Sequence, residues 1–205
     1  KLIVVASTAT DTWESRVLDA GQPRGEFKVV LPRDKGHKYD VDHRDGLFYI
    51  RTNRDAKNFR IVTAPVADPS PANWKPFLDH DKDVLVSGID LFRDFAVVSD
   101  KKAGLNRLRI YDFAKKSWRE MSFPEPVYML WPGGTPEYTS AKFRYSYQSF
   151  TTPPSIYDVE MASGSSTLLK RQEVLGGYDP AKYVSERLWA TARDGVKVPI
   201  SIVYP

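Results

Sequence analysis

Leu47-Phe-Tyr-Ile-Arg-Thr52 is one of four short apolar runs that decide the fold of this 205-residue chain. The other three are Leu2–Ser7, Phe95–Asp100 and Phe143–Gln148. Successive runs start 45, 48 and 48 residues apart. Short apolar runs bounded by turn-forming residues predict β-strands. Their regular spacing predicts a repeated structural unit.

Two further strand-like segments follow each run in the same order. The second series comprises residues 16–20, 60–66, 107–113 and 155–161, and the third comprises residues 27–32, 74–79, 118–123 and 167–173. One more strand fits before the later modules, around residues 38–43, 85–91 and 137–141. A period of roughly 40–50 residues with four strands per unit is typical of β-propeller blades. A β-sandwich would place strands every 8–12 residues or so, without similarity at every fourth strand.

The modules predict an all-β chain that contains part of a propeller. Complete four-stranded modules are expected at residues 38–79, 85–123 and 128–174, and three strands of a further blade precede them, about 3.7 blades in all. Closed propellers usually have about four to eight blades. Because the count is low and the chain begins at Lys1 in mid-strand, without a starting Met, we expect it to be a segment of a longer protein.

The repeat ends near Gly176-Gly177. Beyond this break, residues 185–192 and 196–204 flank Asp194-Gly195, a pair that favours a tight type I′ hairpin turn. Apolar and polar residues alternate in the second arm, so one face of this hairpin should need a partner. Pro199 within that arm predicts an edge or an irregularity, because proline cannot donate a ladder hydrogen bond. We therefore expect one domain over residues 1–175 and the start of another over residues 176–205.

Composition narrows the function classes. The chain has a net charge of +4, but basic and acidic residues alternate, so no nucleic-acid partner is expected. No apolar stretch approaches the roughly 20 residues that cross a bilayer, so no membrane partner is expected. The absence of cysteine excludes disulfides within these residues. A cytoplasmic location is the expectation, with the periplasm as the alternative.

The histidines suggest a metal site that extended geometry argues against. His37, Asp40, Asp42 and His43 lie within seven residues. In a strand rising roughly 3.3 Å per residue the two imidazoles would be about 20 Å apart, with both carboxylates on the opposite face. We expect no metal and no cofactor, and we expect Asp42, His43 and Arg44 to serve blade packing or strand-end hydrogen bonds. His80 stands apart from this group.

No nucleophilic site is predicted either. Gly164-Ser165-Ser166 lacks the second glycine of a nucleophile elbow and lies between strands, so it predicts a polar hairpin loop. Gly133-Gly134 and Gly176-Gly177 lack the spacing and the following helix of a phosphate-binding loop. Six aromatic residues could line a binding surface but are expected mainly to pack between blades: Trp74, Trp118, Tyr128, Trp131, Tyr145 and Phe150.

Four stretches carry a family resemblance: residues 41–53, 56–60, 149–158 and 183–204. They resemble the oligopeptidase B branch of the prolyl oligopeptidase family of serine peptidases, and the similarity runs from end to end. The last stretch, with Ser185-Glu-Arg-Leu188 and Ala192-Arg-Asp-Gly195, discriminates best between branches.

The resemblance implies a seven-bladed propeller that covers an α/β-hydrolase domain. Residues 1–175 would be the later blades, and the hairpin after residue 176 would begin the hydrolase domain. Enzymes of this branch cleave short peptides after Arg or Lys, and the propeller restricts access by size. Short basic peptides and the enzyme's own hydrolase domain are therefore the expected partners. No position here matches the catalytic motif, so no catalytic, cofactor-binding or metal-binding residue is assigned. The alternative is a non-catalytic propeller that serves as a binding scaffold.

Overall fold

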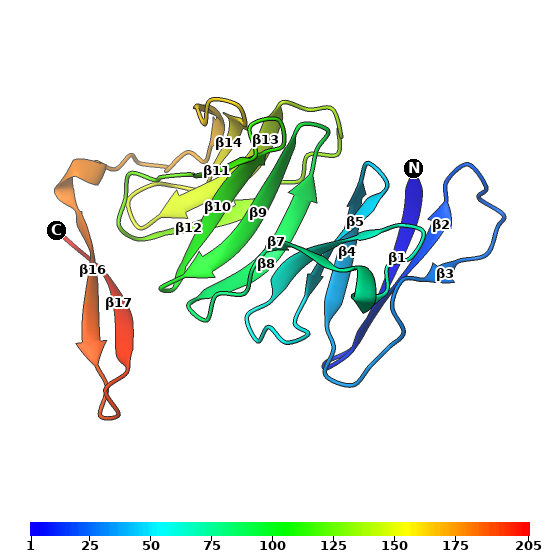
Figure 1. The fold of residues 1–205 in the computed structure, drawn as a ribbon. Coiled ribbons are helices and arrows are strands. Elements are labelled where there is room, and N and C mark those ends of the chain that lie inside the picture. Colours follow the sequence, from blue (N-terminus) through cyan, green and yellow to red (C-terminus); the bar gives the residue numbers. More distant parts are fainter. The chain divides into compact units, whose positions relative to one another are not determined.

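The computed structural model describes all residues, 1–205, and is built almost entirely of β-strands (Figure 1). Seventeen strands form five antiparallel sheets, one of three strands, three of four strands and one of two. The predicted all-β fold with four-stranded modules is thus confirmed. The contacts within the chain divide it into two compact units, Lys1–Leu91 and Phe92–Pro205.

The first unit begins with a three-stranded sheet in the order β1-β2-β3 and continues with a four-stranded sheet in the order β4-β5-β6-β7. Their strands are β1 (Leu2–Thr8), β2 (Trp13–Asp19), β3 (Lys28–Val29), β4 (Tyr39–Arg44), β5 (Leu47–Thr52), β6 (Arg60–Pro65) and β7 (Lys75–Leu78). The unit ends with β8 (Val84–Leu91), the first strand of the next sheet. Each predicted strand in this part of the chain is present.

The second strand of each four-stranded sheet is the most deeply buried. In β5 the side chains of Phe48, Tyr49 and Ile50 are all buried. They therefore form a continuous apolar run instead of an alternating pattern, as expected for a strand that is covered on both faces. Ile50 and Phe48 join a core that also contains Val30, Leu31, Tyr39, Val62 and Ala64.

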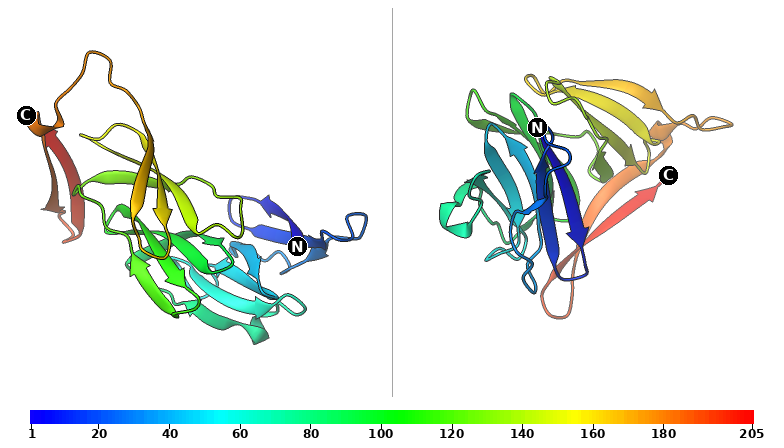
Figure 2. Two further views of the ribbon diagram at one scale, coloured as in Figure 1. Left: turned by 90° about the horizontal axis from the view of Figure 1, so that it is seen from above. Right: turned by 90° about the vertical axis from the view of Figure 1, so that its right-hand side faces the viewer.

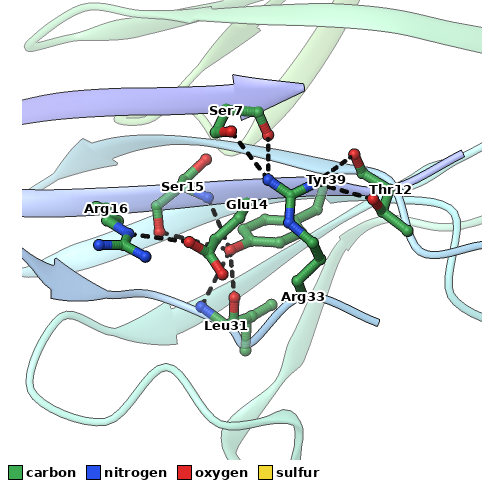
Figure 3. A network of polar contacts seen from close by, with 8 residues as sticks. All are labelled: Ser7, Thr12, Glu14, Ser15, Arg16, Leu31, Arg33 and Tyr39. Atoms are coloured by element: carbon green, nitrogen blue, oxygen red, sulfur yellow. Dashed lines mark hydrogen bonds and ion pairs between the residues drawn. The ribbon is translucent and has the colours of Figure 1, made fainter. Parts of the chain in front are cut away.

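A tyrosine hydroxyl ties the three-stranded sheet to the loop that follows it (Figure 3). The backbone N–H groups of Ser15 and Leu31 donate to the hydroxyl oxygen of Tyr39 at 2.9 and 3.1 Å, and this hydroxyl donates to the Leu31 carbonyl at 2.6 Å. Nearby, the guanidinium of Arg33 donates to the side-chain and backbone oxygens of Thr12 and Ser7. Tyr39 and Arg33 thus hold the loop that follows β3, whose backbone forms few hydrogen bonds with strands.

The second unit contains the remaining strands of the sheet β8-β9-β10-β11 and the whole sheet β12-β13-β14-β15. The strands are β9 (Phe95–Lys102), β10 (Leu105–Asp112), β11 (Ser117–Glu120), β12 (Tyr128–Pro132), β13 (Lys142–Ser149), β14 (Ser155–Glu160) and β15 (Ser166–Arg171). Val97, Leu108, Phe143 and Val159 lie at the centre of its core. Every residue of β11 and β15, the last strands of their sheets, is at least partly exposed to solvent.

One predicted strand was wrong. Residues 137–141 form a turn, in which the Ser140 N–H donates to the Glu137 carbonyl at 2.9 Å. The first strand of this sheet is instead β12, whose Leu130 is buried in the core. The segment Pro132-Gly-Gly-Thr-Pro136 ends β12 early, because its prolines cannot donate ladder hydrogen bonds. The chain therefore turns where a later strand was expected.

The chain ends in a separate two-stranded hairpin, β16 (Val184–Thr191) with β17 (Lys197–Tyr204). Figure 2 shows it as a distinct ribbon at the red end of the chain. Pro199 pairs with Trp189 without a register shift, since each strand of a two-stranded sheet has an open edge. Cross-strand pairing places Leu188, Val198 and Ile200 on one face, where about half of each side chain is exposed, at 45%, 44% and 43%.

The turn of this hairpin differs from the predicted type I′ turn. The Gly195 N–H donates to the Ala192 carbonyl at 2.9 Å, which closes a three-residue loop, and only Gly195 has a positive φ, of +83°. A type I′ turn needs positive φ at both central residues. Asp45-Gly46, between β4 and β5, meets that condition with φ values of +50° and +76°.

Helical structure is limited to two short 3₁₀ turns, η1 (Pro71–Asn73) and η2 (Pro180–Lys182). The sequence itself predicts short helical turns over Ser70-Pro-Ala-Asn73 and residues 181–185, and the first of them contains η1. The turn η2 begins one residue before the second predicted segment, whose last residues belong to β16. Neither turn has the length or the hydropathy of a membrane-spanning helix.

Candidate functional site

Three carboxylates gather on the first strands of two successive sheets in the first unit. Asp40 and Asp42 share one face of β4 because they are two residues apart, and Asp90 lies near the end of the neighbouring strand β8. All three are partly buried. First strands that contact each other are expected where blades converge around a central channel. The carboxylates therefore mark a candidate surface for cationic ligands.

Asp40 differs from the other two because it has a strong cationic partner. Its carboxylate forms an ion pair with the guanidinium of Arg51, which also donates to the Val86 carbonyl at 3.3 Å. The same guanidinium lies 4.4 Å from the ring centre of Phe59 and 5.5 Å from that of Trp13. Burial raises the pKa of Asp40 although Arg51 opposes the change.

Asp42 and Asp90 have no ion pair with lysine or arginine. Burial raises the pKa of Asp90 to about 6, and the neighbouring charge of Asp42 adds to the increase. Burial also raises the pKa of Asp42, although its carboxylate accepts the His43 N–H at 2.7 Å. Two half-buried carboxylates of like charge attract a cation, because a cation would relieve both their desolvation and their repulsion.

The second unit contains a carboxylate with a different role. Glu125 accepts hydrogen bonds from four hydroxyl groups, those of Tyr147 at 2.7 Å, Thr152 at 2.8 Å, Ser149 and Thr151. Burial alone would raise its pKa, but the hydroxyl donors hold the pKa below its ordinary value. Glu125 thus fixes the loop that connects β13 to β14.

A cavity of about 300 Å³ opens beside this loop in the second unit. Its apolar wall includes Leu105, Tyr128, Met129 and Phe150, and its polar rim includes Gln148, Arg187 and Ser201. Arg187 and Ser201 are cross-strand partners on one face of the hairpin. The cavity therefore joins the hairpin to the edge of two sheets.

The histidines named in the sequence do not converge. His37 lies in the loop before β4 and is buried, where its Nε2 is 2.8 Å from the Thr52 hydroxyl and its ring stacks on Tyr39. His43 lies within β4, and His80 accepts the Asn58 N–H at 3.3 Å. No imidazole of the chain is hydrogen-bonded to a serine, and no group of three or more His, Cys, Asp or Glu side chains could hold a metal ion. Arg44 forms an ion pair with Asp45 at 2.9 Å in the β4–β5 turn.

The serine and glycine motifs lie in turns. Ser165 falls in the β14–β15 turn, and Ser166, the first residue of β15, accepts the Tyr145 hydroxyl at 2.9 Å. Gly133-Gly134 follows β12, and Gly176-Gly177 lies in the connection to η2.

The six aromatic residues divide between packing and surface. Tyr145, Tyr128 and Trp74 pack in or against the two cores, whereas Trp118, Trp131 and Phe150 are 37%, 40% and 54% exposed. Three of the six therefore join a core, and Trp118 packs outside the cores on the ring of Tyr111, with 4.9 Å between ring centres.

Asp90 and Glu125 are not singled out by the sequence patterns, and Arg187 is named only as part of the stretch Ser185-Glu-Arg-Leu188. Glu125 lies between two prolines in a loop, and its four hydroxyl partners are 22 to 27 residues away. Asp90 gains its character from β4, which lies in another sheet. The one available signal was the cluster Ser149, Thr151 and Thr152, whose hydroxyls need a common acceptor when buried.

Comparisons with known proteins show which family the chain matches. Residues 1–172 match the family described as "Prolyl oligopeptidase, N-terminal beta-propeller domain". Dipeptidyl aminopeptidase BI of Pseudoxanthomonas mexicana is 40% identical over the whole of this chain, which spans 28% of that protein. The closed form of Trypanosoma brucei oligopeptidase B with covalently bound antipain matches with a TM-score of 0.87 and 31% identity, over 100% of this chain and 30% of that one. Leishmania major oligopeptidase B matches with a TM-score of 0.88 and 33% identity, over 99% and 30%.

Proposed function

Because the chain belongs to the prolyl oligopeptidase family, through its N-terminal β-propeller domain, we propose that it forms part of a serine oligopeptidase that cleaves short peptides after Arg or Lys. The match over residues 1–172 is the observation that carries this proposal. Members of this family are serine peptidases. The similarity to oligopeptidase B over nearly the whole chain, at 31% and 33% identity, supports this branch.

The proposed division of labour leaves the bond-breaking chemistry outside these residues. In the complete enzyme a serine hydroxyl attacks the carbonyl after Arg or Lys, a histidine accepts its proton, and a carboxylate orients that histidine. We assign none of these three roles to residues 1–205, in which His37 is bonded to Thr52 and His80 to the Asn58 N–H. We place the start of the catalytic domain in the β16–β17 hairpin, whose exposed apolar face is suited to packing against that domain.

The propeller's own role in this proposal is selection by size and charge. Blades that surround a narrow channel admit flexible peptides and exclude folded proteins, and opening between domains would control access. Asp42 and Asp90, which lack lysine or arginine partners, would favour peptides that carry positive charge.

The test uses the complete enzyme that contains this chain. Matched chromogenic peptides ending in Arg, Lys, Pro or Leu before the reporter group should show kcat/KM higher for Arg and Lys by at least about 100-fold. The same Arg site placed in short peptides of increasing length, and in a surface loop of a folded protein, should be cut progressively less. Equal rates for Pro and Arg would contradict the specificity, and cleavage of the folded protein would contradict the selection by size.

The isolated 205 residues provide a second test. They should neither hydrolyse the Arg peptide nor react with a serine-directed phosphonate, whereas the complete enzyme should do both. Labelling of Ser165 or Ser166 in the isolated chain would overturn the assignment of chemistry to another domain. A complete protein that binds peptides without cleaving any would support the alternative, a propeller that serves as a binding scaffold.

A further inference from the structure

The cavity beside the β16–β17 hairpin combines an apolar wall with donors and no free acid. Leu105, Tyr128, Met129 and Phe150 supply the wall, and the volume of about 300 Å³ is at the small end of ligand sites. Among the polar side chains that line it, Ser149 already donates its hydroxyl to Glu125, and three others are the guanidinium of Arg187, the amide of Gln148 and the hydroxyl of Ser201. All three can donate hydrogen bonds.

The guanidinium of Arg187 has free hydrogen-bond donors that could bind an anion. Its Nη2 donates to the Ala103 carbonyl, and its guanidinium lies 5.2 Å from the Trp189 ring centre, but it forms no ion pair with a carboxylate. A guanidinium has five donors, so most remain available. Gly104, with φ of +82°, permits this position, because a Cβ there would lie 2.9 Å from Arg187 Nη2.

The other donors at the rim are also available. The amide of Gln148 has only the Met129 sulfur as a partner, at 3.7 Å, and no hydrogen bond occupies the Ser201 hydroxyl. No carboxylate lines the cavity, and the nearby acids already have hydrogen-bond or ion-pair partners. Glu125 accepts four hydroxyls, and Glu120 pairs with Arg107 at 2.9 Å. A ligand carboxylate would therefore meet donors without meeting a competing free carboxylate.

We infer that this cavity binds the C-terminal residue of a short peptide, with its apolar side chain against Met129 and Phe150 and its free α-carboxylate on Arg187. Planar guanidinium and carboxylate groups form paired hydrogen bonds, which give both strength and orientation. The identity of the ligand as a peptide rests on the proposed function. The recognition of an apolar group that carries a carboxylate rests on the cavity alone.

The binding test compares two probes on the complete enzyme by calorimetry: N-acetylphenylalanine, which has a free carboxylate, and N-acetylphenylalaninamide, which does not. The acid should bind at least about tenfold more tightly, since a charged hydrogen-bonded pair contributes that much or more. Equal affinities in the unmodified enzyme would overturn the inference without any variant.

Variants locate the effect. Arg187→Gln should abolish the preference for the acid, and Phe150→Ala should lower the affinity for both probes to the same extent. Arg193→Gln, in the exposed loop of the same hairpin, is the matched control and should leave the preference unchanged. An acid preference that survives Arg187→Gln, in protein whose melting curve is unchanged, would also overturn the inference.

A kinetic readout separates this inference from the proposed function. If both hold, peptides with a free C-terminal carboxylate should have a lower KM than their amides, and Arg187→Gln should remove the difference. Cleavage after Arg with no preference for the acid probe would refute this site and leave the proposed function standing. Preference for the acid probe in an enzyme that does not cleave after Arg or Lys would refute the proposed function alone.

Discussion

At the scale of single residues, Asp90 shows how a neighbouring sheet changes the chemistry of one side chain. Its pKa is raised to about 6, first by burial and then by the charge of Asp42 on β4. The protonated form is therefore favoured in the folded chain. Because the unfolded chain releases this proton at lower pH, stability falls as pH rises between about 4 and 6, and the ionisation penalty is complete above that range.

Asp90→Asn should therefore stabilise the chain at neutral pH and have little effect near pH 4. The expected gain is roughly 1–2 kcal/mol at pH 7.5, less than the full value of the pKa shift because solvent screens a partly exposed group. Urea unfolding at several pH values measures it. Asp83→Asn, an exposed aspartate just before β8, is the control and should change stability little at any pH. A gain that is the same at pH 4 and pH 7.5 would show that ionisation is not its cause.

Tyr39 illustrates the opposite case, in which a buried polar atom is fully used. Replacing it by Phe would leave the N–H groups of Ser15 and Leu31 without their acceptor. Each unsatisfied buried group costs about 1–3 kcal/mol, so the two together predict that Tyr39→Phe lowers the free energy of unfolding by about 2–6 kcal/mol. Tyr183→Phe, at an exposed position, should have little effect in the same urea titration. Equal losses for the two variants would contradict the role of this hydroxyl.

At the scale of elements, local sequence signals are enough to predict most of the strands. Leu47–Thr52 and Phe95–Asp100 are apolar runs bounded by turn residues, and both lie in strands. The strand β12 was not predicted. Its sequence, Tyr-Met-Leu-Trp-Pro, is an aromatic segment that fits a loop as well as a strand. The Asp-Gly pair correctly predicts a turn in both hairpins that contain it. The type of turn depends on loop length, which the dipeptide alone does not specify.

The candidate sites were less predictable because they depend on contacts between elements. Arg187 and Phe150 lie 37 positions apart and meet at one cavity only after the hairpin folds back. Asp42 and Asp90 belong to different sheets. A sequence pattern of period two predicts which residues share a face of a strand but not which strand lies opposite.

The Glu125 loop gives an element-scale prediction. Glu125→Ala should increase amide hydrogen exchange at Thr151 and Thr152, because the loop loses the acceptor of its hydroxyls. In the unmodified chain the loop should also loosen as pH falls, since the pKa of Glu125 is lowered and its ionised form supplies the stabilisation. Glu137→Ala, in the exposed turn before β13, is the control. Unchanged protection in Glu125→Ala would show that the prolines of the loop suffice to hold it.

At the scale of the whole chain, the β16–β17 hairpin presents apolar surface with no partner among residues 1–205. Leu188, Val198, Ile200 and Ile202 share one face and are each 37–45% exposed. Contiguous exposed apolar residues on an open two-stranded sheet promote association, both through the face and through unpaired strand edges. A second protein surface that covers this face, such as the proposed catalytic domain, would remove the tendency.

We therefore expect the isolated 205 residues to self-associate at micromolar concentration, while the complete enzyme does not. Ile200→Lys places a charge in the middle of the apolar face and should shift the isolated chain toward monomer in light scattering. Val203→Lys places the same charge on the opposite face of β17 and should shift it less. In the complete enzyme Ile200→Lys should lower stability more than Val203→Lys, because Ile200→Lys would bury an unpaired charge. Equal behaviour of the two variants in both proteins would show that this face has no partner, and the hairpin would then belong to the propeller rather than to a second domain.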